Sequence, residues 1–122
     1  MVSVISELNE IVADLKATKV VDAVAVVRRD GILMASNFPQ YALGNEVFAM
    51  MSATIIGAAK NITQKSSMGM PSRITIHTKD GNIIIASAGP RALLVCLIKD
   101  SRDPNLLSEA LEATGAKVNA VI

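Results

Sequence analysis

The stretch PSRITIHTKDGNIIIASAGPRALLVCLIKD, residues 71–100, decides the fold because it holds three strand-like runs separated by two tight turns. The first run alternates apolar and polar residues, which is typical of a strand with one buried face. The other two runs are apolar on both faces at their centres, so we expect them to lie inside a sheet. The predicted strands are residues 73–79, 82–88 and 92–98.

Turn residues connect these runs, and the same pattern recurs earlier in the chain. Asp80-Gly81 and Gly89-Pro90 favour tight turns. Upstream, the valine-rich residues 20–28 predict a strand, since β-branched side chains suit a pleated surface. Asp30-Gly31 then predicts a hairpin turn, and residues 32–36 return as a second strand.

Three helices are predicted around these strands. Residues 3–17 carry apolar side chains at helical spacing, and Ser3 or Ser6 can cap the helix. Residues 43–65 form the second helix, and Asp103-Pro104 is a strong start signal for the third. The order α-β-β-α-β-β-β-α predicts one α/β domain of the α+β sandwich type over residues 1–122.

The helix at 43–65 has no polar face, which indicates burial on more than one side. One side can cover the sheet, and the other then needs a partner. Small residues such as Ala53 and Gly57 would let a second helix approach closely. The alternative is a central helix buried wholly within its own chain. Two apolar stripes run along it, one of Phe48, Met51, Ile55, Ala59 and Ile62, the other of Leu43, Val47, Met50 and Gly57.

The composition excludes several classes of protein. Half of the residues are hydrophobic and the mean hydropathy is +0.42, which favours an oligomer because small domains keep much of their surface exposed. A net charge of +1 with no Trp, one Tyr and two Phe argues against nucleic-acid binding. No apolar run is long enough to span a membrane. A single cysteine excludes an intrachain disulfide, so we expect a cytoplasmic protein.

Candidate catalytic and ligand-binding residues are few. The chain has no phosphate-binding glycine loop, and His77 and Cys96 are single and far apart, so no cofactor or metal site is predicted. His77 shares its strand face with Arg73 and Lys79 and no carboxylate, so we interpret it as a surface or interface histidine. Cys96 lies in an apolar strand and is expected to be inert. The sequence therefore predicts a protein that is not an enzyme.

The element order and two local runs resemble the Roadblock family. Residues 20–37, VVDAVAVVRRDGILMASN, are similar to its first hairpin, and residues 80–100, DGNIIIASAGPRALLVCLIKD, are similar to its central hairpin. The resemblance covers almost the whole chain. It implies a Roadblock/profilin-like fold, a five-stranded antiparallel sheet with the first and third helices on one face and the second helix on the other.

The same resemblance implies how the protein acts. Family members are typically dimers, in which the edge strand at 73–79 pairs with its copy and the second helices pack together. A short single-domain chain is similar to the prokaryotic, Mgl-type regulators, which act on a Ras-like small GTPase and do no bond chemistry themselves. The predicted homodimer interface comprises Leu43, Val47, Met50, Ala53, Thr54, Gly57, Arg73, Thr75 and His77.

Two other functions fit the same sequence. One is a structural scaffold of the same fold that has no preference for a nucleotide state. The other is a PAS-like or profilin-like sensor of a small molecule, which requires a hollow between sheet and helix lined by a few polar groups. The continuous aliphatic side chains of 83–86 and 93–98 argue against such a hollow.

Overall fold

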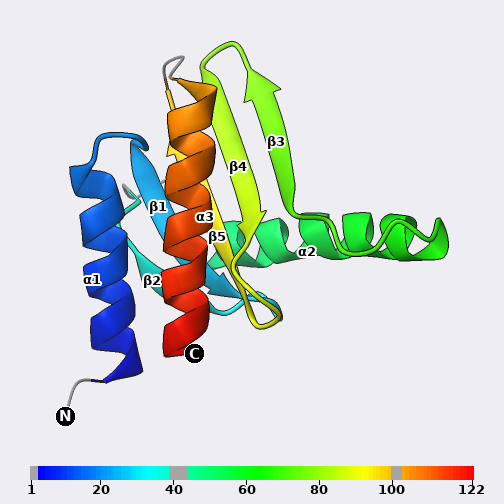
Figure 1. Ribbon diagram of the computed structural model, residues 1–122, viewed down its shortest axis with the longest axis horizontal. Coiled ribbons are helices and arrows are strands. Elements are labelled where there is room, and N and C mark those ends of the chain that lie inside the picture. Colours follow the sequence, from blue (N-terminus) through cyan, green and yellow to red (C-terminus); the bar gives the residue numbers. More distant parts are fainter. Residues whose placement is uncertain (1–2, 39–43, 100–102) are drawn as a thin grey trace.

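The computed structural model describes residues 3–38, 44–99 and 103–122. Within these residues the chain forms three helices and five strands in the predicted order (Figure 1). The elements are α1 (Val4–Ala17), β1 (Ala23–Arg28), β2 (Leu33–Ser36), α2 (Asn45–Lys65), β3 (Arg73–Thr78), β4 (Gly81–Ser87), β5 (Ala92–Ile98) and α3 (Pro104–Val121).

The five strands make one antiparallel sheet in the order β2-β1-β5-β4-β3. The two runs that are apolar on both faces, β4 and β5, lie inside the sheet as predicted. The alternating run, β3, pairs only with β4 among the described strands and forms one edge of the sheet. The short strand β2 forms the other edge.

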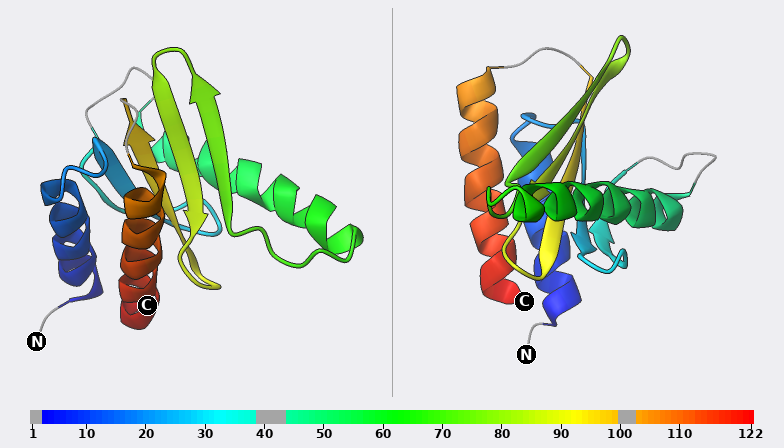
Figure 2. Two further views of the ribbon diagram at one scale, coloured as in Figure 1. Left: turned by 45° about the horizontal axis from the view of Figure 1, so that its top comes forward. Right: turned by 90° about the vertical axis from the view of Figure 1, so that its right-hand side faces the viewer.

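Helices cover both faces of the sheet, and each face has its own core. α1 and α3 lie side by side on one face, over a cluster that includes Leu8, Leu94 and Val118 (Figure 2). α2 crosses the opposite face, over a cluster that includes Ile56 and Ile85. This is the expected arrangement of helices, and it confirms the predicted fold class.

The helix starts follow the signals in the sequence. Ser3 is the N-cap of α1, and its hydroxyl oxygen accepts a hydrogen bond from the backbone N–H of Ser6 at 3.1 Å. Asp103 caps α3 by accepting from the N–H of Asn105 at 2.9 Å, with Pro104 as the first helical residue. These caps satisfy backbone donors that the first turn of a helix leaves unpaired.

The turns differ in detail from the predictions. The two-residue turn between β3 and β4 is Lys79-Asp80, because Thr78 pairs with Gly81 across the hairpin. Gly81 is the first residue of β4 and has φ +146°, and a Cβ there would lie 3.0 Å from the Ile98 carbonyl oxygen. Both this positive φ and the close approach of β5 therefore favour glycine at position 81.

The first hairpin also differs from its prediction. β1 starts at Ala23, not Val20, and Lys19, which follows α1, has φ 62°. Val20 and Val21 are buried all the same. In the following turn only Gly31 has positive φ, so Asp30-Gly31 is not a two-residue turn, and four residues separate Arg28 from Leu33.

Candidate interaction surface

α2 rests on the sheet through a narrow stripe of mostly small side chains. Ala49, Ser52, Ala53 and Ile56 are buried, and the Ser52 hydroxyl donates to the Phe48 carbonyl oxygen at 2.9 Å. Small side chains let the helix lie close to the strands. Ala53 is only 9% exposed and belongs to the core of the subunit, so the prediction that places it in the dimer interface is wrong about its accessibility.

The large apolar side chains of α2 point away from the sheet. Val47, Met51, Ile55, Ala58 and Ile62, named here the α2 seam, are all exposed. They recur every three or four residues, the spacing by which two helices pack along a common seam. Met51 is 53% exposed and Ile62 is 67% exposed.

The sequence analysis missed Met51, Ile55, Ala58 and Ile62 as interface candidates. The feature of the sequence that could have identified them is the row of small residues along one side of α2. A helix whose smallest residues gather on one side packs that side closely, and its larger apolar residues are then left outside. Because every side of α2 is apolar, hydrophobicity alone did not distinguish the two sides.

The other predicted interface residues of α2 lie on or beside this surface. Val47 is 41% and Met50 is 58% exposed. Thr54 is exposed, and its hydroxyl donates to the Met50 carbonyl oxygen at 2.9 Å. Gly57 is half-buried, yet a Cβ added to it would meet no atom within 4 Å. The predicted residue Leu43 lies outside the described residues.

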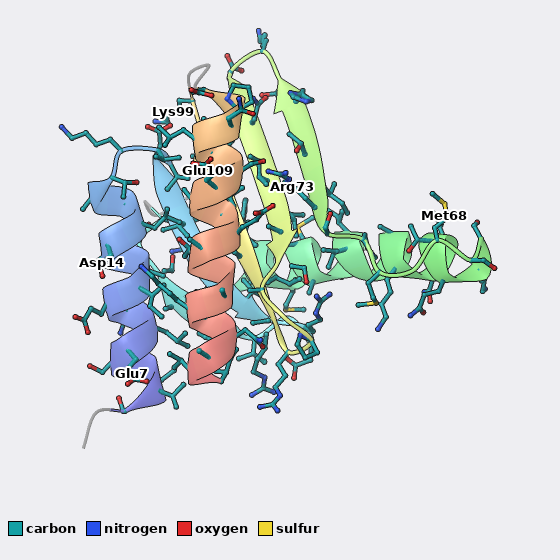
Figure 3. The ribbon with its side chains drawn as sticks, viewed as in Figure 1. Glu7, Asp14, Met68, Arg73, Lys99 and Glu109 are labelled. Atoms are coloured by element: carbon teal, nitrogen blue, oxygen red, sulfur yellow. The ribbon has the colours of Figure 1, made fainter. Side chains whose placement is uncertain are left out.

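The C-terminal part of α2 extends beyond the β3 edge of the sheet (Figures 1 and 2). Residues 66–72 return along it to β3, and Met68 lies near the far end of this projection, which we name the α2 arm (Figure 3). The Gln64 side-chain amide nitrogen and the Met70 sulfur, 3.6 Å apart, link the loop to the helix. Met68 is 74% exposed, so the arm presents apolar surface at its tip.

The β3 edge lies next to the arm. Arg73, Thr75 and His77 are exposed, as an edge strand allows. Their side chains lie on the face that carries α3, because the intervening Ile74 packs into the α2-side core. The Arg73 guanidinium donates to the Ser108 hydroxyl of α3 at 2.9 Å, in the region where Figure 3 labels Arg73.

The predicted interface residues are therefore divided between the two faces of the sheet. Met50 and Gly57 lie on the α2 side, whereas Arg73 and His77 lie on the α3 side. His77 also has a partner within the subunit, since its Nδ1 lies 3.1 Å from the Asn82 Oδ1. What connects the two sets is the backbone of β3, whose outer edge has no neighbouring strand among the described residues.

Groups for chemistry are sparse in the part of the chain that the structure describes. Cys96 is fully buried, and burial raises the pKa of its thiol to about 12, which leaves little reactive thiolate. No three His, Cys, Asp or Glu side chains are placed to hold a metal ion among the described residues. The hollow between α2 and the sheet, next to Phe38 and Phe48, admits no water-sized sphere.

Across the described residues, no helix combines the length and the apolar character needed to cross a bilayer.

The chain was compared with known protein families, and the Roadblock/LC7 domain matches residues 7–98. This chain belongs to the Roadblock/LC7 family. The match ends with β5, and α3 then completes the core of this Roadblock/LC7 domain by burying Leu111 and Val118.

Solved structures share the Roadblock/LC7 fold of this chain. Myxococcus xanthus MglB superposes with a TM-score of 0.87 at 13% identity, covering 96% of this chain and 88% of that one. A structure described as MglB with a tetrameric arrangement gives 0.79 at 14% identity, covering 95% and 90%. Acanthamoeba castellanii profilin II gives 0.64 at 15% identity, covering 93% and 97%. Curated protein sequences gave no significant match.

Proposed function

We propose that this Roadblock/LC7 chain, as a single domain of residues 1–122, is a homodimeric, non-catalytic module that regulates a Ras-like small GTPase in the cytoplasm of a prokaryote. The observation that carries the proposal is the α2 seam, an apolar helix surface that the described subunit leaves uncovered. Monomeric proteins rarely expose contiguous apolar patches of large area, and such patches mark interaction sites.

A second copy of the chain fits this surface. Helices join through seams of the spacing found at Val47, Met51 and Ile55. The β3 edge beside the seam can pair with its own copy, since unpaired strand edges favour added strands. A two-fold arrangement uses the same patch on both subunits and satisfies both requirements at once. The tetrameric arrangement named for an MglB of the same fold supports self-association in this fold.

Burial of the seam would favour association. Full burial of a Met, Ile or Val side chain contributes roughly 1.5–3 kcal/mol. Met51, Ile55 and Ile62 are 40–67% exposed, so part of this contribution is still available in the subunit. In a dimer the seams of both subunits would contribute this burial free energy. It would offset the loss of translational and rotational freedom on association.

Mutation of the seam tests the homodimer. Met51→Glu with Ile55→Glu would place two charges in a dry helix contact, so light scattering of the purified chain should show the mass of one subunit. The matched control is Ile5→Glu with Leu106→Glu, which alters two apolar residues on α1 and α3 that are at least 49% exposed. The control should stay dimeric. A monomeric wild type, or a seam variant that remains a dimer, would contradict the proposal.

The partner follows from the resemblance to Mgl-type regulators, which act on Ras-like GTPases. Met50, Met51, Met68 and Met70 give this side of the molecule a methionine-rich surface. Methionine is flexible and polarisable, so such a surface adapts to a partner whose switch segments change shape. We expect the module to favour one nucleotide state of that partner.

A binding assay tests the GTPase proposal and separates it from the scaffold alternative. A Ras-like GTPase encoded next to this gene would be loaded with a GTP analogue or with GDP and titrated with the chain by calorimetry. We expect at least about tenfold tighter binding of one state, which corresponds to about 1.4 kcal/mol. Equal binding of both states, with no change in GTP hydrolysis, would favour the scaffold. Absence of binding would reject both.

A further inference from the structure

Three arginines gather where the β1–β2 turn meets the β4–β5 turn. Arg28 and Arg29 lie at the end of β1, and the backbone N–H of Arg29 donates to the Arg91 carbonyl oxygen at 3.1 Å. Arg28 has a counter-charge, because its guanidinium pairs with the Asp30 carboxylate. Among the described residues Arg29 forms no such ion pair, whereas the Arg91 Nη1 donates to the Ile122 carbonyl oxygen at the end of α3.

The Arg29 side chain is held in place by neutral acceptors. Its Nη2 donates to the Ser87 hydroxyl oxygen at 2.6 Å and to the Gly89 carbonyl oxygen at 2.9 Å. These two bonds use both hydrogens of Nη2. Nε is buried and has no hydrogen-bond partner among the described residues. Nη1 carries two further donors and makes no hydrogen bond to the described protein groups, so its donors remain available to a ligand.

The surroundings of Arg29 disfavour an isolated cation. The residue is half-buried, and the loss of hydration lowers the pKa of its guanidinium. Arginine nevertheless stays charged in proteins, so the positive charge remains in a partly desolvated position. A charge that is partly removed from water is most stable beside an opposite charge. The described part of the chain provides none at this position.

The acceptor side of the site packs against α3. Gly89 has φ +86°, and a Cβ there would fall 2.1 Å from the Asn119 Oδ1, so α3 packs directly against the β4–β5 turn. The Gly89 carbonyl oxygen holds the Arg29 guanidinium from this turn. A guanidinium that is already held before a ligand arrives loses less conformational entropy on binding.

We infer that Arg29 is an anion-binding residue, whose free Nη1 end receives an oxyanion, either a carboxylate or a phosphate group. Charge-assisted hydrogen bonds from a guanidinium to an oxyanion are about twice as strong as neutral ones. The site adjoins α2, because a Cβ on Gly31 of the same turn would lie 3.3 Å from the Met50 Cα. This inference is independent of the proposed GTPase, since it depends only on the residues of this chain.

The competing interpretation is that Arg29 only ties the two turns together. Titration of the full-length, isotopically labelled chain with inorganic phosphate, and separately with acetate, distinguishes the two by NMR at constant ionic strength. We expect saturable shifts of the Arg29 side-chain and Gly89 amide signals. Saturation by phosphate alone identifies a phosphate site, and saturation by both identifies a general oxyanion site.

Matched variants decide the outcome. Arg29→Met should weaken phosphate or acetate binding at least about tenfold, since it removes the guanidinium that is inferred to receive the oxyanion. Arg28→Met removes the neighbouring arginine, which is already paired, and should leave the affinity within about twofold. If Arg29→Met does not fold, Ser87→Ala removes one of the bonds that orient the guanidinium and should weaken binding without removing the charge. Shifts that do not saturate, or that survive equally in every variant, would overturn the inference.

Discussion

The two faces of the sheet are built from similar side chains but differ in how completely they are covered. On the first face, α1 and α3 together enclose a core in which Leu8, Val24 and Val118 have no exposed area. On the second face, α2 alone encloses Ile85 to the same degree. Yet the outer side of α2 exposes 67% of Ile62. We therefore call the side covered by α1 and α3 the closed face, and the side covered by α2 alone the open face.

This difference between the two faces arises from the helices rather than from the strands. α1 carries Glu10 and Lys16 on its exposed side, and its buried residues Leu8, Val12 and Leu15 face the sheet. α2 has no comparable polar side, and covering one face of it leaves the other apolar. The closed face is thus expected to set the stability of the subunit. The open face is expected to set what the subunit binds.

The largest effect should come from removing a buried side chain on the closed face. Leu8→Ala would leave a cavity among the side chains beneath α1 and α3, and we expect a loss of about 2–5 kcal/mol in the free energy of unfolding. Denaturant unfolding at fixed protein concentration measures it.

Val4 on the same helix provides the control for Leu8. It is 42% exposed, so Val4→Ala should change the free energy of unfolding by no more than about 0.5 kcal/mol. Equal losses for the two variants would mean that the first face is not closed in the way described.

A pH effect of intermediate size should come from Cys96, which lies in the closed core. Burial raises its pKa from 9.0 to about 12 in the folded chain, so the folded state keeps the thiol proton where the unfolded state releases it. The stabilisation is complete below about pH 9 and is lost as pH rises toward 12. We expect a loss of roughly 1.4 kcal/mol per pH unit in that window.

Cys96→Ala separates this effect from every other effect of pH on the chain. The free energy of unfolding would be measured for both chains from pH 8 to 11, and the difference between them should shrink as pH rises. A difference that stays constant would show that the thiol is accessible to water. The first face would then not be closed as described. Slow reaction of the native chain with a thiol reagent at pH 8 should accompany the expected result.

Much of the fold was predictable because several signals agree locally. The bounds of β5 match residues 92–98 because the whole run is apolar and is bounded by turn residues. Asp103 and Pro104 fix the start of α3 through a side-chain cap and a fixed φ. The edge position of β3 agrees with its alternation of polar and apolar residues. In each case the residues that decide the structure are neighbours in sequence.

The interaction surface was less predictable because it depends on distant contacts. Ala53 was assigned to a partner, but the strands of its own subunit bury it. Its size allows close packing against either a sheet or a helix, so the residue alone does not distinguish them. The contacts of the Arg29 side chain also depend on distant residues. Its acceptors, Ser87 and Gly89, lie about sixty residues away in the chain, and no local pattern reveals them.

The smallest expected effect gives the most direct comparison of the two faces, because each carries one helical glycine. Alanine is favoured over glycine in a helix by about 0.5–1 kcal/mol. On the open face, a Cβ at Gly57 meets nothing within 4 Å, so Gly57→Ala should raise the free energy of unfolding by that amount at low protein concentration. On the closed face, a Cβ at Gly115 lies 3.3 Å from the Ser87 carbonyl oxygen. Gly115→Ala should therefore gain nothing or destabilise the chain.

Protein concentration extends this test to the proposed dimer. If a second helix covers Gly57, the gain from Gly57→Ala should fall or reverse as the concentration rises, because the added methyl group separates the two helices. The effect of Gly115→Ala should not depend on concentration, since its surroundings belong to one subunit. Urea unfolding at two concentrations about a hundredfold apart measures both. A gain at Gly57 that is the same at both concentrations would place the contact on another part of α2.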